Sequence, residues 1–520
     1  MATAPVCCRM CRGVETTVTM RSTTRLLASL LIGAMPVLAH AAGSDAADAA
    51  QRNDIAALRA MVTKRVDVNT PQPDGTTALH WAAHWNDVEA VKLLLGAGAN
   101  AATTNRFGAS PLSEAATSGN ADMVKALLDA GADAKALSTP DGETVLMSAA
   151  RVGSVESVRM LLDRGADVNA RERYKGQTAL MWAAAERHAP VVKLLLERGA
   201  DWKIRGFDRE TKPPKLSAAS AISPIPRGGF TALMFTAREG DIESARIMLD
   251  AGVDVNVGDV DNVTPLVAAI MNKQYTLAKF LIDRGADVNI ADAGGRAALY
   301  AMIDIRNEDW TAMPNRTTDD PLPTIEVVKA IVDHGAKVDA PLTRPLTVRS
   351  GMDFGDTTLG EGATPLMRAA RAGDHDVIRL LLTKGANATL TTKGGNTALM
   401  FAGGIGYRDK NTRGSERDAL ESVKVLMAAG LDLKQTNAIG ENVLHGAALR
   451  GADTIVQFLI DQGVDVNALS RQGYTPLDVA MGKTIVLQLP VPQESTVALL
   501  KKLGGKEGPG PRGARPPAAQ

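Results

Sequence analysis

The feature that most constrains the fold of this 520-residue chain is a short sequence unit that recurs about every 33 residues. Three copies read GTTALHWAAHWNDVEAVKLLLGAGAN (75–100), GQTALMWAAAERHAPVVKLLLERGAD (176–201) and GGFTALMFTAREGDIESARIMLDAGVD (228–254). A unit of this length cannot bury both of its faces alone, so the copies must stack into an array with one continuous core. Alignment on the T-x-L element gives eleven anchor positions, most of them 33 or 34 residues apart: Thr77, Ser110, Thr144, Thr178, Thr231, Thr264, Ala297, Thr364, Thr397, Asn442 and Thr475.

Each unit is expected to contain a tight turn followed by two helices. A glycine lies two residues before ten of the eleven anchors, and Asn262 takes that place before the other one. These residue types tolerate positive φ, which a tight turn requires. The anchor side chain can cap a short first helix, where small residues such as Ala82 and Ala83 permit close helix approach. A second helix carries apolar residues at helical spacing and ends at a glycine such as Gly98.

The composition favours helices over strands. Hydrophobic residues make up 45% of the chain but aromatic residues only 3%, so the core consists mainly of the aliphatic residues of closely packed helices. A stripe of larger residues just before the small pair is expected to fill gaps in this core: Trp81, Trp182, Phe235 and Phe401, with Met147, Met181, Met234, Met367 and Met400. The sequence therefore predicts an all-α repeat protein.

This period of turn, helix and helix, with its T-P-L-H-like signature, resembles the ankyrin repeat family. The segments SPLSEAA, TPLMRAA and TALHWAA carry the resemblance. It implies an ankyrin solenoid of stacked helix pairs, with hairpin fingers at right angles to the helices and a concave palm lined by the first helices. Residues 44–69 lack the T-x-L turn but keep a second helix and a DVN motif, so they predict an N-terminal cap. We expect about twelve helix-turn-helix units within residues 44–505.

Five insertions interrupt the period, near residues 203–228, 306–323, 340–361, 403–416 and 482–492. The first and third fall in fingers, and the other three fall between the two helices of a unit. Insertions in repeat proteins collect in loops, where both a binding role and a simple solvated loop are open interpretations. Residues 506–520 are rich in Gly and Pro and are expected to be disordered.

Residues 1–41 are expected to be a cleavable secretory signal peptide, with translation starting at Met1 or at Met20. A basic segment at 20–25 precedes an apolar run at 26–38 and the tripeptide AHA that ends at Ala41. The apolar run is shorter than the ~20 residues of a membrane span, so we expect cleavage after Ala41 and no membrane insertion. The mature protein is expected to be periplasmic or secreted.

The expected mature chain lacks cysteine and is close to neutral. Cys7, Cys8 and Cys11 all lie in the predicted signal peptide, so no disulfide is expected. Removing residues 1–41 leaves 54 basic and 57 acidic residues. Nucleic acid is not an expected partner, because binding to phosphates needs an excess of basic residues on one face.

The resemblance also implies which residues touch a partner, namely those just after the small pair of the first helices and those at the finger tips. Trp, Tyr and Arg frequently anchor interfaces, although each residue here is equally compatible with ordinary surface. The candidates on first helices are His84, Trp85, Arg151, Arg238, Glu239, Arg371 and Arg450, and those in fingers are Phe107, Tyr174, Lys175, Phe230 and Tyr474. The predicted function is a monomeric, non-enzymatic protein–protein interaction scaffold of the bacterial envelope, which binds through the concave face and hairpin tips.

No catalytic residue, cofactor or metal site is predicted, because no nucleophile elbow, paired-carboxylate or zinc motif is found. His80 and His84 lie one helical turn apart, a spacing at which two imidazoles can bind one metal. His80, however, fills the His of T-P-L-H, where the resemblance implies a hydrogen bond to the turn backbone. The alternatives are a small-molecule or metal-binding envelope protein, an enzyme whose site the insertions assemble, or an exported effector acting on a host protein.

Overall fold

The computed structural model describes residues 44–208, 228–307, 319–345, 359–407, 414–483 and 492–510. Within these ranges the chain forms twelve helix pairs and no β-strand, with only two isolated β-bridges. The first helices of the pairs are α1 (Asp45–Gln51), α3 (Ala78–His84), α5 (Pro111–Ser118), α7 (Val145–Val152), α9 (Ala179–Ala185), α11 (Ala232–Glu239), α13 (Pro265–Met271), α15 (Ala298–Arg306), α17 (Pro365–Ala372), α19 (Ala398–Gly403), α21 (Val443–Arg450) and α23 (Pro476–Ala480). The second helices are α2 (Ile55–Thr63), α4 (Val88–Gly96), α6 (Ala121–Asp129), α8 (Val155–Asp163), α10 (Ala189–Glu197), α12 (Ile242–Asp250), α14 (Tyr275–Asp283), α16 (Thr324–Asp333), α18 (His375–Thr383), α20 (Glu416–Ala428), α22 (Asp453–Asp461) and α24 (Glu494–Lys502). The predicted all-α array of twelve units is confirmed.

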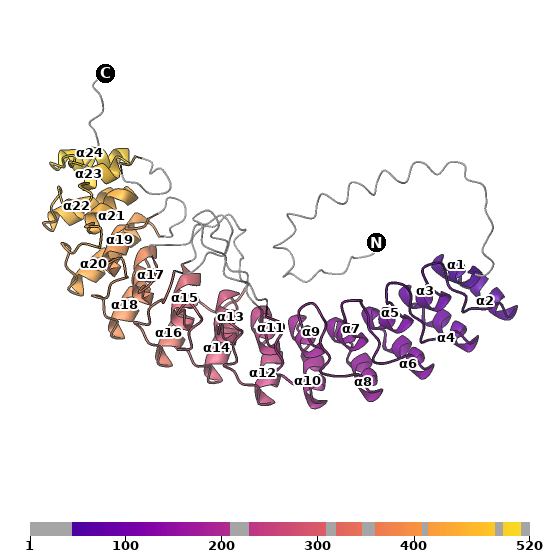
Figure 1. Cartoon of the computed structure of the whole chain (residues 1–520). Coiled ribbons are helices and arrows are strands. Elements are labelled where there is room, and N and C mark those ends of the chain that lie inside the picture. Colours follow the sequence, from indigo (N-terminus) through magenta and orange to yellow (C-terminus); the bar gives the residue numbers. More distant parts are fainter. Residues whose placement is uncertain are drawn as a thin grey trace, which may run out of the picture.

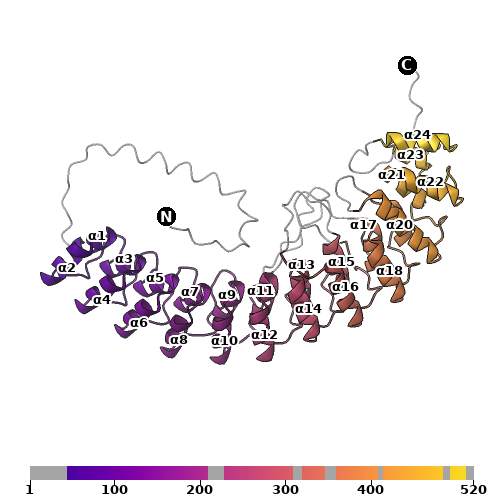
Figure 2. The same ribbon diagram turned by 180° about the vertical axis from the view of Figure 1, so that it is seen from behind.

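The helix pairs stack side by side into an arch. The first helices lie on its inner, concave side and the second helices on its outer side (Figure 1), and the view from behind shows the same order (Figure 2). Each first helix packs against its own second helix and against the first helix of the next unit. Buried Ala and Leu side chains form one core along the whole array. The large-residue stripe is part of this core, with Phe401 and Met147 fully buried and Trp81 and Trp182 half-buried.

Positive φ occurs at both predicted positions in each unit. The ten glycines before the anchors have φ between 68° and 89°, and Asn262 in the same place has φ of 63°. The glycines that end the second helices, from Gly98 to Gly463, have φ between 81° and 89°. An L side chain is strained in this region of backbone conformation. The repeated glycines therefore set the turn and the helix end of each unit.

Most anchor residues cap the first helices as predicted, whereas Ala297 has no side-chain acceptor for this role. The Thr144 hydroxyl, for example, accepts a hydrogen bond from the backbone N–H of Met147 at 3.3 Å. In the second unit His80 extends this cap to the neighbouring unit. Its Nδ1 accepts from the Thr77 N–H at 3.2 Å, and its Nε2 donates to the Ala109 carbonyl at 3.1 Å. The hydrogen bond that the resemblance implied for His80 is present, and burial lowers the pKa of this imidazole.

The recurrent DVN motif links one unit to the next. The Asn169 side chain donates from Nδ2 to the Gly199 carbonyl at 3.3 Å, and its Oδ1 accepts from the Asp201 N–H at 2.8 Å. The same pair of bonds is made by Asn69, Asn289 and Asn467. The side chain thus satisfies a helix-end carbonyl that has no partner within its own helix.

Both ends of the array differ from the expectation. The N-terminal cap contains both helices of a unit, since α1 precedes α2 and buries four Ala side chains. At the other end, the expected disorder does not hold for residues 506–510. Gly508 donates its N–H to Asp478 Oδ2 at 2.7 Å, and Thr475 Oγ1 donates to the Lys506 carbonyl at 2.8 Å. These bonds replace those that a following unit would make to the last first helix.

Several predicted segments lie outside the described residues. They are residues 1–43, which hold the predicted signal peptide and all three cysteines, and residues 511–520 of the predicted disordered tail. The central parts of the five predicted insertions also lie outside: residues 209–227, 308–318, 346–358, 408–413 and 484–491.

The close contact between α19 and α21 yields a first testable prediction. A Cβ atom on Gly446 would lie 2.6 Å from the backbone nitrogen of Ile405. Gly446→Ala is therefore expected to lower the free energy of unfolding by about 1–3 kcal/mol, although Ala is the better helix former. The control is Gly96→Ala in α4, where nothing lies within 4 Å of the added Cβ. This change is expected to stabilise its unit by up to about 1 kcal/mol. Native-state hydrogen exchange of α19 to α22 for the first variant and of α3 to α6 for the control would refute the prediction if the two shifts in stability had the same sign.

Candidate protein-binding surface

The fingers form a row along the array, in which the backbones of most neighbouring fingers are hydrogen-bonded to each other. The N–H of Arg173 donates to the Asp141 carbonyl at 2.7 Å, and the N–H of Phe207 donates to the Lys175 carbonyl at 2.6 Å. Equivalent bonds at 2.8–3.0 Å start from Arg106, Ala293, Thr343, Lys393, Ala438 and Arg471. The finger row is thus held in place before any partner binds, and the sequence pattern had not indicated these bonds.

The palm is the exposed inner face of the first helices, and at its N-terminal end it presents an aromatic group. The rings of Trp81 and Trp85 contact the His84 imidazole edge-on, with centroids 5.7 and 5.2 Å away. His84 Nδ1 lies 3.2 Å from Glu114 Oε2 of the next unit. Trp85 is exposed, as predicted. This end of the palm offers the large, amphipathic side chains that anchor protein interfaces.

The middle of the palm combines Arg side chains with aromatic rings. The Arg151 guanidinium lies 5.3 Å from the Trp182 ring centroid, and that of Arg238 lies 5.0 Å from the Phe235 centroid. Arg238 also pairs with Glu239 at 2.5 Å. Phe230 packs edge-on against Phe235 at 5.6 Å between centroids. These predicted residues are half-buried, so their charges are held in fixed positions by the rings around them.

Two finger residues of the predicted set are strongly exposed. Phe107 is 63% exposed and Tyr174 is 67% exposed, while Lys175 is half-buried and has its Nζ 5.7 Å from the Tyr174 ring centroid. Phe207 is also exposed, but the sequence did not point to it because it lies in a segment assigned to an insertion. Its N–H donates to the Lys175 carbonyl, so it holds in its finger the position that Arg173 holds in the preceding one.

The exposure predicted for Arg371 and Tyr474 is wrong. Arg371 is 5% exposed and donates from Nη2 to the Gly406 carbonyl at 3.2 Å, because α19 packs over it. Tyr474 is 7% exposed. It precedes the anchor directly, and this position is buried or half-buried in all eleven anchored units because it faces the neighbouring finger. Arg450 is half-buried, with its guanidinium 4.7 Å from the Tyr407 ring centroid.

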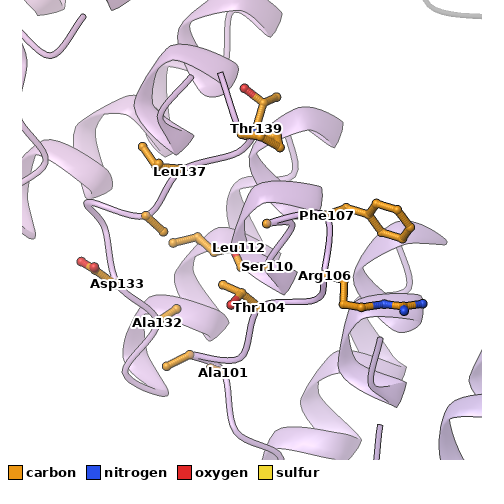
Figure 3. Close-up of a pocket in the computed structure, with 14 residues that line it drawn as sticks. Ala101, Thr104, Arg106, Phe107, Ser110, Leu112, Ala132, Asp133, Leu137 and Thr139 are labelled. Carbon is orange, nitrogen blue, oxygen red and sulfur yellow. The ribbon is translucent and has the colours of Figure 1, made fainter. Parts of the chain in front are cut away.

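A small pocket of about 500 Å³ lies between the fingers of the third and fourth units (Figure 3). Ala101, Leu112 and Leu137 contribute to its largely apolar wall. The side chains of Arg106 and Phe107 extend to one side of it, away from Leu137 (Figure 3). Arg106 and Asp133 also line the pocket, and they lie on opposite sides of it in Figure 3.

Two further observations concern metals and membranes. Among the described residues, no three His, Cys, Asp or Glu side chains come close enough together to hold a metal ion. His84 is bonded to Glu114 and His80 to the backbone, so the two imidazoles have separate partners. In the same part of the chain no helix combines the length and apolar character needed to cross a bilayer.

The fold and this surface define a helical-repeat protein whose extended inner face and finger row are preformed. The comparisons with known proteins agree with this class. The family model described as "Ankyrin repeats (3 copies)" matches residues 47–137, 130–205, 217–292, 324–409 and 414–490. These matches cover most of the chain, which belongs to the ankyrin repeat family. Ankyrin repeats are protein–protein interaction domains and are generally not enzymes.

Individual relatives match only part of the chain. The putative ankyrin repeat protein FPV031 of Fowlpox virus (strain NVSL) is 33% identical over 143 residues, which are 26% of this chain and 38% of the viral protein. Phosphocholine transferase AnkX of Legionella pneumophila is 27% identical over 179 residues, which are 34% of this chain and 16% of AnkX. The crystal structure of the human ASB11 ankyrin repeat domain has a TM-score of 0.38 and 24% identity, and it covers 47% of this chain and 99% of its own. The chain thus spans less than half the length of FPV031 and of AnkX.

Proposed function

We propose that this protein is a non-enzymatic scaffold that binds a protein partner through the palm and the finger row. The observation that carries the proposal is the alignment of exposed aromatic residues, from Trp85 and Phe107 to Tyr174, along neighbouring units whose helices pack on each other. Stacking sets their spacing before binding, so little ordering entropy opposes association. The activity named for AnkX is not proposed here, because the likeness covers 16% of that protein.

We propose further that the protein acts in the bacterial envelope, in the periplasm or outside the cell. The support is the order of a basic segment, an apolar run and the tripeptide AHA within residues 20–41. Fractionation of cells expressing the full chain should recover a protein whose N-terminal residue is Ala42 from the periplasm or the medium. Recovery of an uncleaved chain from the cytoplasm would contradict this location.

The binding surface is tested with paired variants of the purified chain. Partners are captured from envelope extract, identified, and measured directly against the wild type and against Trp85→Ala combined with Phe107→Ala. Because exposed aromatic anchors often contribute about 2 kcal/mol or more, we expect the double variant to bind at least tenfold more weakly. The control is Lys193→Ala on the outer helix α10, which is expected to bind like the wild type. Equal affinity of the partner for all three proteins would refute the proposed surface.

A further inference from the structure

The fingers of the fifth and sixth units carry a group of cations that is unusual for this molecule. The four cations Arg171, Arg173, Lys175 and Arg205 lie around the exposed rings of Tyr174 and Phe207, and we refer to these six residues as the basic finger patch. None of the four cations forms an ion pair with a carboxylate within the part of the chain that the structure describes.

Three arginines on the outer face of the array are neutralised in a regular way. Arg164 pairs with Asp129 of the preceding unit at 2.5 Å, and Arg198 pairs with Asp163 at 2.7 Å. Arg284 pairs with Asp250 in the same manner at 2.5 Å. Repetition of the unit thus supplies one acidic partner for each of these arginines. The basic finger patch departs from this arrangement, which leaves positive charge directed to solvent.

The one carboxylate inside the fifth finger is turned inward. Glu172 is buried and accepts backbone hydrogen bonds from Tyr174, Lys175 and Gln177 at 2.5, 2.7 and 3.0 Å. Its negative charge therefore holds the loop in shape. Two further aspartates lie at the ends of the patch. The Asp141 carbonyl accepts from the Arg173 N–H, and Asp208 directly follows Phe207 in the sequence.

The two fingers are also locked together across the patch. The Arg171 guanidinium lies 4.5 Å from the Phe207 ring centroid and donates to the carbonyls of Arg205 at 2.6 Å and Gly176 at 3.3 Å. These bonds use two of its five N–H groups, and among the described residues the other three have no acceptor. A planar guanidinium held by stacking is well suited to binding a carboxylate through two parallel hydrogen bonds.

The positive charge does not continue along the finger row immediately beyond the patch. In the next two fingers Asp259 is buried, Asp261 is half-buried, and Arg296 is neutralised by Asp292 at 2.9 Å. A polyanion that followed the row, such as a nucleic acid strand, would therefore find no continuation of the cations of the patch in these two fingers. The patch therefore suits a short acidic segment that crosses the row at this one place.

We propose that the basic finger patch binds an acidic peptide segment of the partner protein, with an apolar residue of that segment against Tyr174 and Phe207. The inference rests on the proposed function, since it names the chemistry of the partner at one part of the same surface. Carboxylates would bind the exposed guanidinium and ammonium groups, which raises the association rate and makes the affinity depend on salt.

The test measures binding of a fluorescein-labelled octapeptide, Glu-Asp-Phe-Asp-Glu-Leu-Asp-Glu, to the purified chain. The variant is Arg173→Glu combined with Lys175→Glu, and the control is Lys92→Glu combined with Lys193→Glu on the outer helices, which changes the net charge equally. We expect at least tenfold weaker binding to the first variant and less than twofold change in the control. A matched peptide with Gln and Asn in place of the acids is expected not to bind.

Three results would overturn the inference: no binding of the acidic peptide to the wild-type chain, equal binding to the wild type and the patch variant, or tighter binding of a twenty-residue oligothymidylate or of phosphatidylglycerol vesicles. The outcome for the proposed function is separate from the outcome for this inference. If the captured partner binds the patch variant at full affinity but binds the variant with Trp85→Ala and Phe107→Ala more weakly, the inference about the acidic segment is wrong and the proposed function stands.

Discussion

Replacing Asp374 by Ala is expected to destabilise the centre of the array by about 3–5 kcal/mol, the usual cost of removing one partner of a buried ion pair. The Asp374 side chain is only 7% exposed. It accepts hydrogen bonds from Arg306 Nε at 2.7 Å and Nη2 at 3.4 Å and from Asn307 Nδ2 at 3.0 Å, and it caps α18 by accepting from the Val377 N–H at 3.4 Å. Alanine removes all four bonds and leaves the Arg306 guanidinium without its carboxylate partner and the buried Asn307 amide with one acceptor fewer.

The matched control is Asp87→Ala, which makes the same change at the same position of the second unit. The Asp87 carboxylate caps α4 by accepting from the Ala90 N–H at 2.9 Å. Loss of a helix cap alone costs about 1 kcal/mol. Because long repeat arrays do not unfold as one unit, the comparison is made by native-state hydrogen exchange of α15 to α18 for one variant and of α3 to α6 for the other. Equal losses in the two regions would contradict the role of the ion pair.

Acidification is expected to destabilise the C-terminal units through His445. Burial lowers the pKa of this imidazole from 6.5 to about 4. Its Nδ1 accepts from the Asn442 N–H at 3.2 Å and its Nε2 lies 3.3 Å from the Tyr474 carbonyl, so the neutral ring joins the last two units. Since the pKa is lower in the folded state, stability is complete above pH 6.5 and is lost as the pH falls towards 4. The loss over this window is about 3 kcal/mol.

Two measurements check this prediction. Titration of the His445 ring signals by NMR should place its pKa near 4, and a value above 6 would exclude the effect. Native-state hydrogen exchange of α21 to α24, measured between pH 7.5 and pH 4.5, should show a steeper loss of stability for the wild type than for His445→Gln. The variant keeps the other histidines, including the buried His80, so their common contribution cancels in the comparison.

Most of the fold could be predicted from the sequence because its determinants are local. The glycines before the anchors need positive φ, and the Thr anchors cap the helices that follow them within three residues. The DVN motif could be recognised as part of the repeat, but its role in bonding to the next unit became evident only when Asn169 was seen beside Gly199. Similarly, the residues that follow α24 could not be assigned a cap role, because a Gly- and Pro-rich composition is also typical of disorder.

The candidate surface could be predicted less well. Trp85, Phe107 and Tyr174 are exposed as expected. Arg371 follows the small pair in the same way as Arg151, yet it is buried against Gly406. The sequence position alone does not distinguish the two arginines, because the difference lies in how closely the next unit packs.

The amino-acid sequence alone was sufficient for the period, the turns, the caps, the number of units and the helical class, because each depends on the conformational preferences of residues close together in the chain. The pairing of charges and the exposure of individual side chains were decided only by the tertiary structure. Arg306 and Asp374 are 68 positions apart, and Arg171 reaches the Arg205 carbonyl across 34 positions. Such contacts depend on the exact stacking of neighbouring units and on the insertions between them, which a repeating pattern does not specify.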